Sequence, residues 1–307
     1  MMGDTMKVTD KLLRRFFEIY TQLYENPFMS QNQIARNTGI PRGSISRYLE
    51  EMYERSIMKG PQIFVKPAQN YHLYASFCQF EDPYAAYKGL KELPHVVYRS
   101  WNCGEWNITL IIDTLMNFSV LKGFKECIHQ GVKSVTYLPK VTTLDWDKSL
   151  KKIQQMISTP KEKTTFYEEI PINQWNNQEW ILYNEFKDNT RVQAFPILKK
   201  YKIRYETVEK WISEIPQYAS IHTGFYPQGA SNYFASDFLF QSDFHSQLTN
   251  VLGSLPSTSV FFSVGQYLLA RLCVLTKSEE NDLISLIYQL KEKGYFSQFR
   301  YARALFE

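Results

Sequence analysis

This sequence has few of the patterns that mark common enzyme classes. The four cysteines, Cys78, Cys103, Cys127 and Cys273, form no C-x2-C motif for zinc or redox chemistry. The five histidines form no H-x3-H or H-E-x-x-H pattern, and neither a glycine-rich phosphate loop nor a G-x-S-x-G turn is present. We therefore expect no metal, no cofactor and no catalytic residues.

Long apolar runs are absent as well. No segment approaches the ~18–20 apolar residues that span a bilayer, and the first residues, MMGDTMKVTDK, lack the apolar core of a signal peptide. Glycine and proline, at 13 each, exclude collagen-like and low-complexity classes. We expect a cytoplasmic protein with no membrane partner.

The composition is that of a globular chain with more than one domain. Its 307 residues are 44% hydrophobic and 21% charged, and 35 basic against 31 acidic residues give a net charge of +4. Because this charge is mild, any basic function has to be local.

Residues 9–55 have the pattern of a helix-turn-helix. The first helix would turn inward one apolar face, formed by Leu12, Phe16, Ile19, Tyr20 and Leu23. Ser30 and Gln33 form a capping box for a second helix, and Gly39 permits the tight turn that follows. A third helix over 41–55 would bury Ile45, Leu49 and Met52, and two short strands around Gly60-Pro61 would form a wing.

The outward face of the third helix is basic at its start and acidic at its end. Arg42 and Arg47 can reach phosphates or guanine edges, whereas the first acid is Glu50. The candidate DNA contacts are small, polar or basic residues of this region: Ser30, Gln31, Arg42, Gly43, Ser44, Ser46, Arg47, Tyr48 and Lys59. A three-helix bundle with a solvated basic face is the alternative.

The rest of the chain indicates a second module and then a repeat of both. Residues 71–143 read as strand, helix, two strands, helix and strand, with helices at 82–93 and 116–130. At a shift of 163 residues Ile34 corresponds to Ile197, and at 162 Asn70-Tyr71 corresponds to Asn232-Tyr233. We interpret the chain as a tandem duplication of an α+β unit.

The predicted segments are therefore a winged helix-turn-helix at 1–67, a ferredoxin-like βαββαβ domain at 68–145, a linker at 146–172, a second winged helix-turn-helix at 173–229 and a second βαββαβ domain at 230–307.

This arrangement resembles the Lrp/AsnC (feast/famine) transcription regulators of bacteria and archaea, and residues 30–60 look like that family's DNA-binding signature. The resemblance implies a sequence-specific regulator, and not an enzyme, that places its recognition helix, residues 41–55, in the major groove of double-stranded DNA. It implies that the βαββαβ domains pair and sense an effector. Pairing would occur in a homodimer or, within one fused chain, as an intramolecular pseudo-dimer.

The family's effector loop usually reads G-x-x-D. Here the first copy has Gly104 and Asn107 at its ends, and the second copy has Gly265 and Leu268. Gly104 and Asn107 are therefore the candidate effector loop, and a hairpin turn without a ligand is the alternative.

The recognition helix expected in the second copy differs in charge from the one in the first copy. Residues 204–212 carry Glu206 and Glu209 beside Arg204 and Lys210, so we expect the first copy to hold most of the DNA affinity. The basic residues nearby, a candidate second DNA contact, are Lys199, Lys200, Lys202 and Arg204.

Two other functions stay open at this point. Sirohaem decarboxylases have a similar architecture, and the stretch from His95 to Arg99 followed by Trp106-Asn107 weakly echoes their pattern, although Ser257 replaces His95 in the second copy. A ligand-sensing or interaction protein built on a helix-turn-helix that no longer binds DNA is the third hypothesis.

Overall fold

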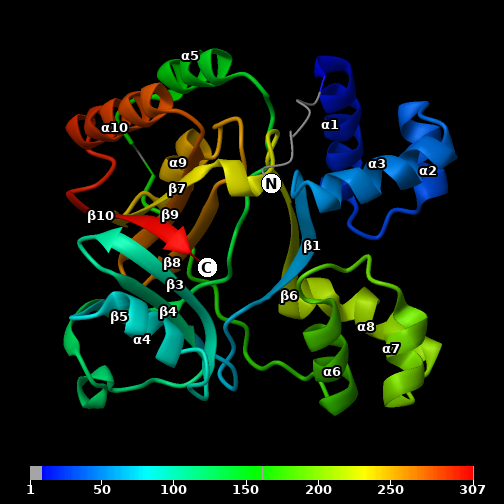
Figure 1. Cartoon of the computed structure of the whole chain (residues 1–307), viewed down its shortest axis with the longest axis horizontal. Coiled ribbons are helices and arrows are strands. Elements are labelled where there is room, and N and C mark those ends of the chain that lie inside the picture. Colours follow the sequence, from blue (N-terminus) through cyan, green and yellow to red (C-terminus); the bar gives the residue numbers. More distant parts are fainter. Residues whose placement is uncertain (1–8, 161, 307) are drawn as a thin grey trace. The chain divides into compact units, whose positions relative to one another are not determined.

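The computed structural model describes residues 9–160 and 162–306. The described chain divides into two compact units that are not consecutive in sequence (Figure 1). The helical unit comprises residues up to 64 together with 176–214 and 221–233, and the barrel unit comprises 65–175, 215–220 and the residues from 234 onward. Each unit is described by itself below.

The helical unit contains two sets of three helices, each followed by a strand. The first set is α1 (Asp10–Glu25), α2 (Gln31–Thr38) and α3 (Arg42–Glu54), followed by β1 (Met58–Val65). The second is α6 (Asn177–Phe186), α7 (Ala194–Tyr201) and α8 (Tyr205–Tyr218), followed by β6 (Ala219–Phe225) and the short η2 (Ala230–Asn232). Strands β1 and β6 pair as a two-stranded sheet.

This pairing corrects the predicted wing. Residues 58–65 form one continuous strand and not two short strands around Gly60-Pro61. The reason is that β6, far away in the sequence, supplies the hydrogen-bonding partner that a local hairpin would otherwise provide.

The three N-terminal helices follow the predicted signals. Ser30 caps α2 by accepting a hydrogen bond from the Gln33 amide at 3.2 Å, and Gly39 ends that helix with φ +68°. The inward residues of α3, Ile45, Leu49 and Met52, are buried as predicted. Four of the five residues predicted for the inward face of α1 are buried, and Leu12 is partly exposed.

The barrel unit is built on a closed eight-stranded barrel. Its strands are β2 (Leu73–Phe80), β3 (Val96–Gly104), β4 (Ile108–Ile112), β5 (Phe124–Lys133), β7 (Phe234–Gln241), β8 (Val260–Val264), β9 (Tyr267–Val274) and β10 (Gln298–Phe306). The order around the barrel is β10-β3-β4-β2-β5-β8-β9-β7, with antiparallel neighbours. The predicted pair of separate sheets is therefore one barrel, closed by β3 with β10 and by β5 with β8.

Helices cover the outside of the barrel unevenly. The helices of the barrel unit are α4 (Pro83–Gly89), α5 (Trp146–Met156), α9 (His245–Leu252) and α10 (Lys277–Glu292). Figure 1 shows α5 and α10 side by side, where Trp146 donates a hydrogen bond to Asp282 at 3.1 Å. Ile153 of α5 joins the apolar cluster under α9 and α10.

The predicted helix at 116–130 is wrong. Those residues form the 3-10 turn η1 (Phe118–Val120) and most of β5. Gly123, with φ +75°, lies between the two. The long ladder from Leu73↔Lys133 to Phe80↔Phe124 stabilises strand geometry there, so tertiary pairing overrides the local apolar spacing.

Within residues 9–160 and 162–306, no helix combines the length and the apolar character that crossing a bilayer requires.

Candidate functional site

The start of α3 exposes two unneutralised cations. Arg42 and Arg47 are exposed, and among the described residues no carboxylate lies within 4 Å of either guanidinium. The ring of Tyr48 packs edge-on against Phe16, with 5.7 Å between ring centroids, and the Arg47 guanidinium lies 5.3 Å from the Tyr48 ring. Tyr48 is thus fixed by the helical core while the two arginines face solvent.

The other predicted contacts lie on this face or beside it. Gly43 and Ser46 are exposed, Ser44 is half-buried, and no described atom lies within 4 Å of where a Cβ on Gly43 would stand. Gln31 is half-buried at the first residue of α2, directly after the cap Ser30. Lys59 is exposed on β1, with its ammonium 5.6 Å from the Tyr226 ring.

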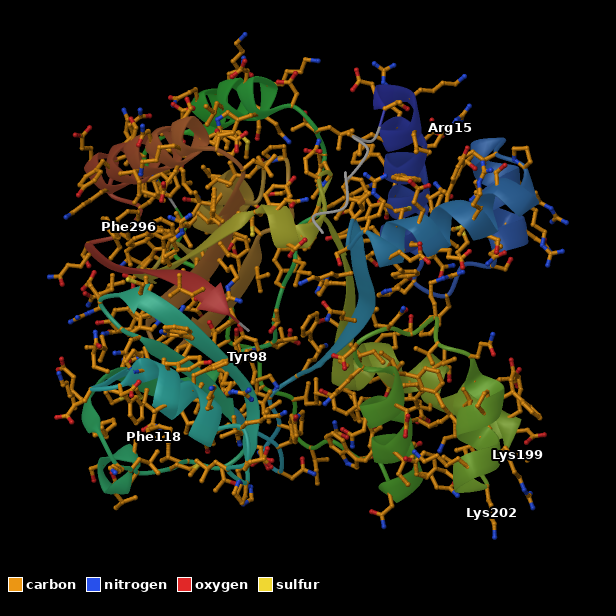
Figure 2. The ribbon with its side chains drawn as sticks, in the orientation of Figure 1. Arg15, Tyr98, Phe118, Lys199, Lys202 and Phe296 are labelled. Carbon is orange, nitrogen blue, oxygen red and sulfur yellow. The ribbon has the colours of Figure 1, made fainter. Side chains whose placement is uncertain are left out.

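The second set of helices carries its basic residues around the end of α7. Lys199, Lys200, Lys202 and Arg204 are all exposed. Figure 2 shows the side chains of Lys199 and Lys202 extending away from the ribbon. Lys200 forms an ion pair with Glu185 at 3.2 Å, so part of this positive charge is neutralised.

Strand β6 carries a partly buried histidine that the sequence pattern did not single out. His222 lies 6.0 Å from the Phe64 ring and 6.5 Å from the Tyr24 ring. Burial lowers the pKa of His222 to about 4.

We expect this histidine to make the protein less stable in mild acid. The unfolded chain takes up a proton near pH 6.5 and the folded chain only near pH 4, so the free energy of unfolding falls as the pH drops between these values, by up to about 3 kcal/mol. Urea unfolding at pH 7 and pH 5 measures this change. The variant His222→Gln should lose the part of the pH dependence that His222 contributes. His129 and His245, whose pKa values burial also lowers, remain in both proteins and cancel in the comparison. An equal pH dependence in both proteins would contradict the prediction.

The barrel interior contains a buried polar network that sequence reasoning missed. Asp237 is fully buried and accepts hydrogen bonds from Arg271, at 2.6 and 2.8 Å, and from Asn102 at 3.2 Å. The third Arg271 nitrogen donates to the Tyr98 hydroxyl at 2.7 Å. The Asn102 side-chain oxygen accepts from Ser100 and Thr109, both at 3.1 Å. We call these six residues the Asp237 network.

The Asp237 network joins strands from the two halves of the barrel. Tyr98 and Asn102 lie on β3, whereas Asp237 and Arg271 lie on β7 and β9. A buried carboxylate is stable only when it is paired and hydrogen-bonded, and both conditions are met here. The Arg271 side chain is 14% exposed, so the network is nearly closed to solvent.

Lys133 is a second buried charge in the barrel. Its ammonium donates to the Ser134 carbonyl at 3.0 Å and to the Thr136 hydroxyl at 2.6 Å, and it lies 4.5 Å from the Phe262 ring. In the described chain no carboxylate pairs with it. Burial lowers the pKa of Lys133 to about 7.

We expect Lys133→Met to stabilise the protein. At and below pH 7 the buried ammonium opposes folding, so its removal should raise the free energy of unfolding by about 2 kcal/mol. The unfolded lysine loses its proton near pH 10.5, so the gain should shrink as the pH rises from 7 toward that value. Urea unfolding at pH 7 and pH 9.5 measures both effects, and a gain independent of pH would contradict them.

The loop predicted to bind an effector connects the barrel strands β3 and β4 and packs against their neighbours. The Asn107 side chain bonds both backbone groups of Phe80, at 2.9 and 2.8 Å. A Cβ on Gly104 would lie 2.6 Å from the Tyr301 carbonyl oxygen, so only glycine fits beside β10. Effector binding here stays a prediction.

The described residues offer no ready metal site, and a modest hollow lies in the barrel unit. No three His, Cys, Asp or Glu side chains in this part of the chain gather as ligands would. A hollow of about 380 Å³ lies beside the β8–β9 hairpin and is lined by Gln241, Ser242, Asp243, Phe244, Gln266 and residues 294–297. None of these lining residues is a lysine, an arginine or a histidine.

Comparison with known proteins identifies the N-terminal helices that carry Arg42 and Arg47. A family model described as winged helix-turn-helix DNA-binding matches residues 17–56. The structure of the siroheme decarboxylase NirDL is similar over 94% of this chain and 90% of that chain, with 11% identity and a TM-score of 0.51. Escherichia coli AsnC is similar over 41% of this chain and 91% of its own, with 15% identity and a TM-score of 0.33. An AsnC-family transcriptional regulatory protein from Pyrococcus furiosus covers 41% of this chain and 89% of its own, with 16% identity and a TM-score of 0.29. No curated protein matches the sequence.

These findings overturn the expectation that the chain is not an enzyme. The nearly full-length structural match is to an enzyme, so this architecture does not exclude catalysis. At 11% identity the match shows a shared fold. The chain thus carries an N-terminal winged helix-turn-helix DNA-binding domain within a fold that it shares with siroheme decarboxylase NirDL.

Proposed function

We propose that the chain is a sequence-specific transcription regulator that inserts α3 into the major groove of DNA. One observation carries this proposal: Arg42 and Arg47 are exposed at the start of α3, with no carboxylate partner in the described chain, within the residues that match a DNA-binding model. A recognition helix presents its N-terminal residues to base edges, which is where these arginines lie.

The neighbouring residues support the same orientation. Arginine can bond guanine O6 and N7 in a bidentate manner, and the small residues Gly43, Ser44 and Ser46 allow the backbone to approach the groove. Glu50 and Glu54, exposed in the second half of α3, lie where the helix would leave the phosphates. Ser30, Gln31 and Lys59 would contact the DNA backbone.

We also infer a tandem duplication in which the chain is its own pseudo-dimer. Three features support this inference: the second three-helix set, the pairing of β1 with β6, and the same strand order in both halves of the barrel. In each half the order is fourth, first, third and second strand, β5-β2-β4-β3 and β10-β7-β9-β8. Lys199, Lys202 and Arg204 would then form a weaker second contact with DNA.

The regulator proposal is tested by DNA binding at two salt concentrations. Random and genomic fragments are titrated with the full chain, and bound sequences are recovered. A steep salt dependence together with selection of a sequence is the expected result. Absence of binding at low salt would overturn the proposal and favour a ligand-sensing or interaction protein.

The second candidate is a tetrapyrrole-acting enzyme similar to siroheme decarboxylase. The observation in its favour is the fold, shared over 94% of this chain. The residues that echo that pattern each have another partner: His95 bonds Asp113 at 2.8 Å, Tyr98 belongs to the Asp237 network, and the Arg99 guanidinium lies 4.4 Å from the Tyr87 ring of α4.

Titration with sirohaem tests this second candidate. A Soret shift followed by carbon dioxide release would establish it. An unchanged spectrum and no gas release would remove it. The two tests are independent, because one measures DNA and the other a tetrapyrrole.

A further inference from the structure

Two of the four cysteines lie directly opposite each other in the barrel. Cys78 of β2 pairs in register with Cys127 of β5, and the Cys78 thiol hydrogen-bonds the Cys127 sulfur. Opposed residues in antiparallel strands have Cα atoms about 4.5–5.5 Å apart. A disulfide spans roughly 4.4–6.8 Å between Cα atoms, a range that includes the spacing of a regular opposed pair. Here a register shift between Phe77 and Cys78 lies directly beside the pair.

The two thiols have different surroundings. Cys78 is fully buried, in a cluster with Phe80, Ile108 and Phe118, whereas Cys127 is exposed. Only the short turn η1, and no helix, precedes β5, where Cys127 is exposed.

This contrast assigns different chemical roles to the two sulfurs. The hydrogen bond from Cys78 lowers the pKa of the Cys127 thiol and outweighs burial, which raises it. The Cys127 thiol also donates to the His129 carbonyl at 3.3 Å. The hydrogen bond to Cys127 and burial both raise the pKa of Cys78. The exposed sulfur is therefore the better nucleophile, and the buried one retains its proton beside it.

We propose that Cys78 and Cys127 form a peroxide-reactive dithiol site that closes as a reversible disulfide. The Cys127 thiolate attacks one oxygen of a hydroperoxide, the O–O bond breaks, and sulfenic acid forms while hydroxide, or alkoxide, leaves. Cys78 then attacks the Cys127 sulfur. The S–O bond breaks, the S–S bond forms, and the hydroxyl leaves with the Cys78 proton as water. Two molecules of a small thiol such as glutathione return the site to the dithiol by exchange: the first forms a mixed disulfide with one cysteine, and the second releases that cysteine and leaves as the oxidised glutathione dimer.

The first test uses the full chain without substitutions. Reduced protein is treated with hydrogen peroxide, free thiols are blocked with N-ethylmaleimide, and tryptic peptides are analysed without reduction. We expect peptide 126–133 linked to the peptide that contains Cys78, lighter by two hydrogen atoms than the two peptides together. Cys103, exposed on β3 opposite Arg303, is the matched internal control. We also expect iodoacetamide to modify Cys127 at least about threefold faster than Cys103.

Substitutions separate the two steps. In Cys78→Ser the reaction should stop at a sulfenic acid on Cys127, which dimedone traps, whereas Cys103→Ser should leave disulfide formation unchanged. Circular dichroism shows whether each variant is folded. If Cys78→Ser is not folded, the linked-peptide analysis of the unsubstituted protein tests the proposal. Equal oxidation of Cys127 and Cys103 with no linked peptide would overturn the proposal, whatever the outcome of the DNA-binding test.

Discussion

Replacing both Arg42 and Arg47 with alanine should weaken DNA binding about 100-fold, because each arginine interaction with a base edge or phosphate is worth roughly 1–3 kcal/mol. Both side chains are exposed and contribute little to the helical core, so the variant should remain folded. Fluorescence anisotropy with a selected DNA fragment measures the affinity, and circular dichroism measures the fold. The salt dependence of binding should also become shallower by about one unit for each arginine that neutralises a phosphate in the complex.

A matched variant, Lys199→Ala with Lys202→Ala, removes an equal number of positive charges, two, from the second set of helices. We expect its affinity to fall only several-fold, because Glu206 and Glu209 lie on the neighbouring helix α8 and are exposed. Equal reductions in the two variants would mean that both helix sets bind DNA equally. Unchanged affinity in the arginine variant would place the DNA-binding face elsewhere.

Asp237→Ala should destabilise the protein by about 3–5 kcal/mol, since removing one partner of a buried ion pair leaves the other uncompensated. Arg271 would lose both of its bonds to the carboxylate, and Asn102 would lose an acceptor in an interior that admits little water. Urea unfolding followed by tryptophan fluorescence gives the free energy of unfolding, and Trp106, which donates to Thr109 of the network at 2.9 Å, reports on the barrel interior.

Asp243→Ala is the control for this destabilisation. The Asp243 carboxylate also forms a 2.8 Å ion pair, with Lys163, but both side chains are exposed. We expect no measurable shift of its unfolding midpoint. The double variant Asp237→Ala with Arg271→Met should recover part of the stability, because the network then holds no uncompensated charge. An Asp237→Ala variant as stable as the unsubstituted chain would show that the network does not hold the barrel together.

The helix-turn-helix was predictable because its determinants are local. The apolar spacing of α1 and α3, the cap Ser30 and the turn at Gly39 all act within a few residues. Exposure of Arg42 and Arg47 followed from the burial of Ile45 and Leu49 on the opposite side of the helix.

Barrel closure and the buried network were beyond such reasoning. Closure depends on β3 pairing with β10 and β5 with β8, and no local pattern encodes partners so far apart in the sequence. Asp237 and Arg271 are each the single charged residue of their strand and belong to no motif. The helix predicted at 116–130 failed for a related reason, since the partner strand β2 decides the conformation of β5.

The closed barrel also has a consequence for how this sequence can evolve. In an assembly of two identical chains every substitution occurs twice, so both copies of the interface change together. Here all eight strands belong to one chain, and each half can change alone. Asp237 and Arg271 illustrate this, because at a shift of 162 residues Asp237 corresponds to Ala75, which pairs with Ile111. We expect a chain with such freedom to recognise a DNA site whose two halves differ, a target that two identical subunits match poorly.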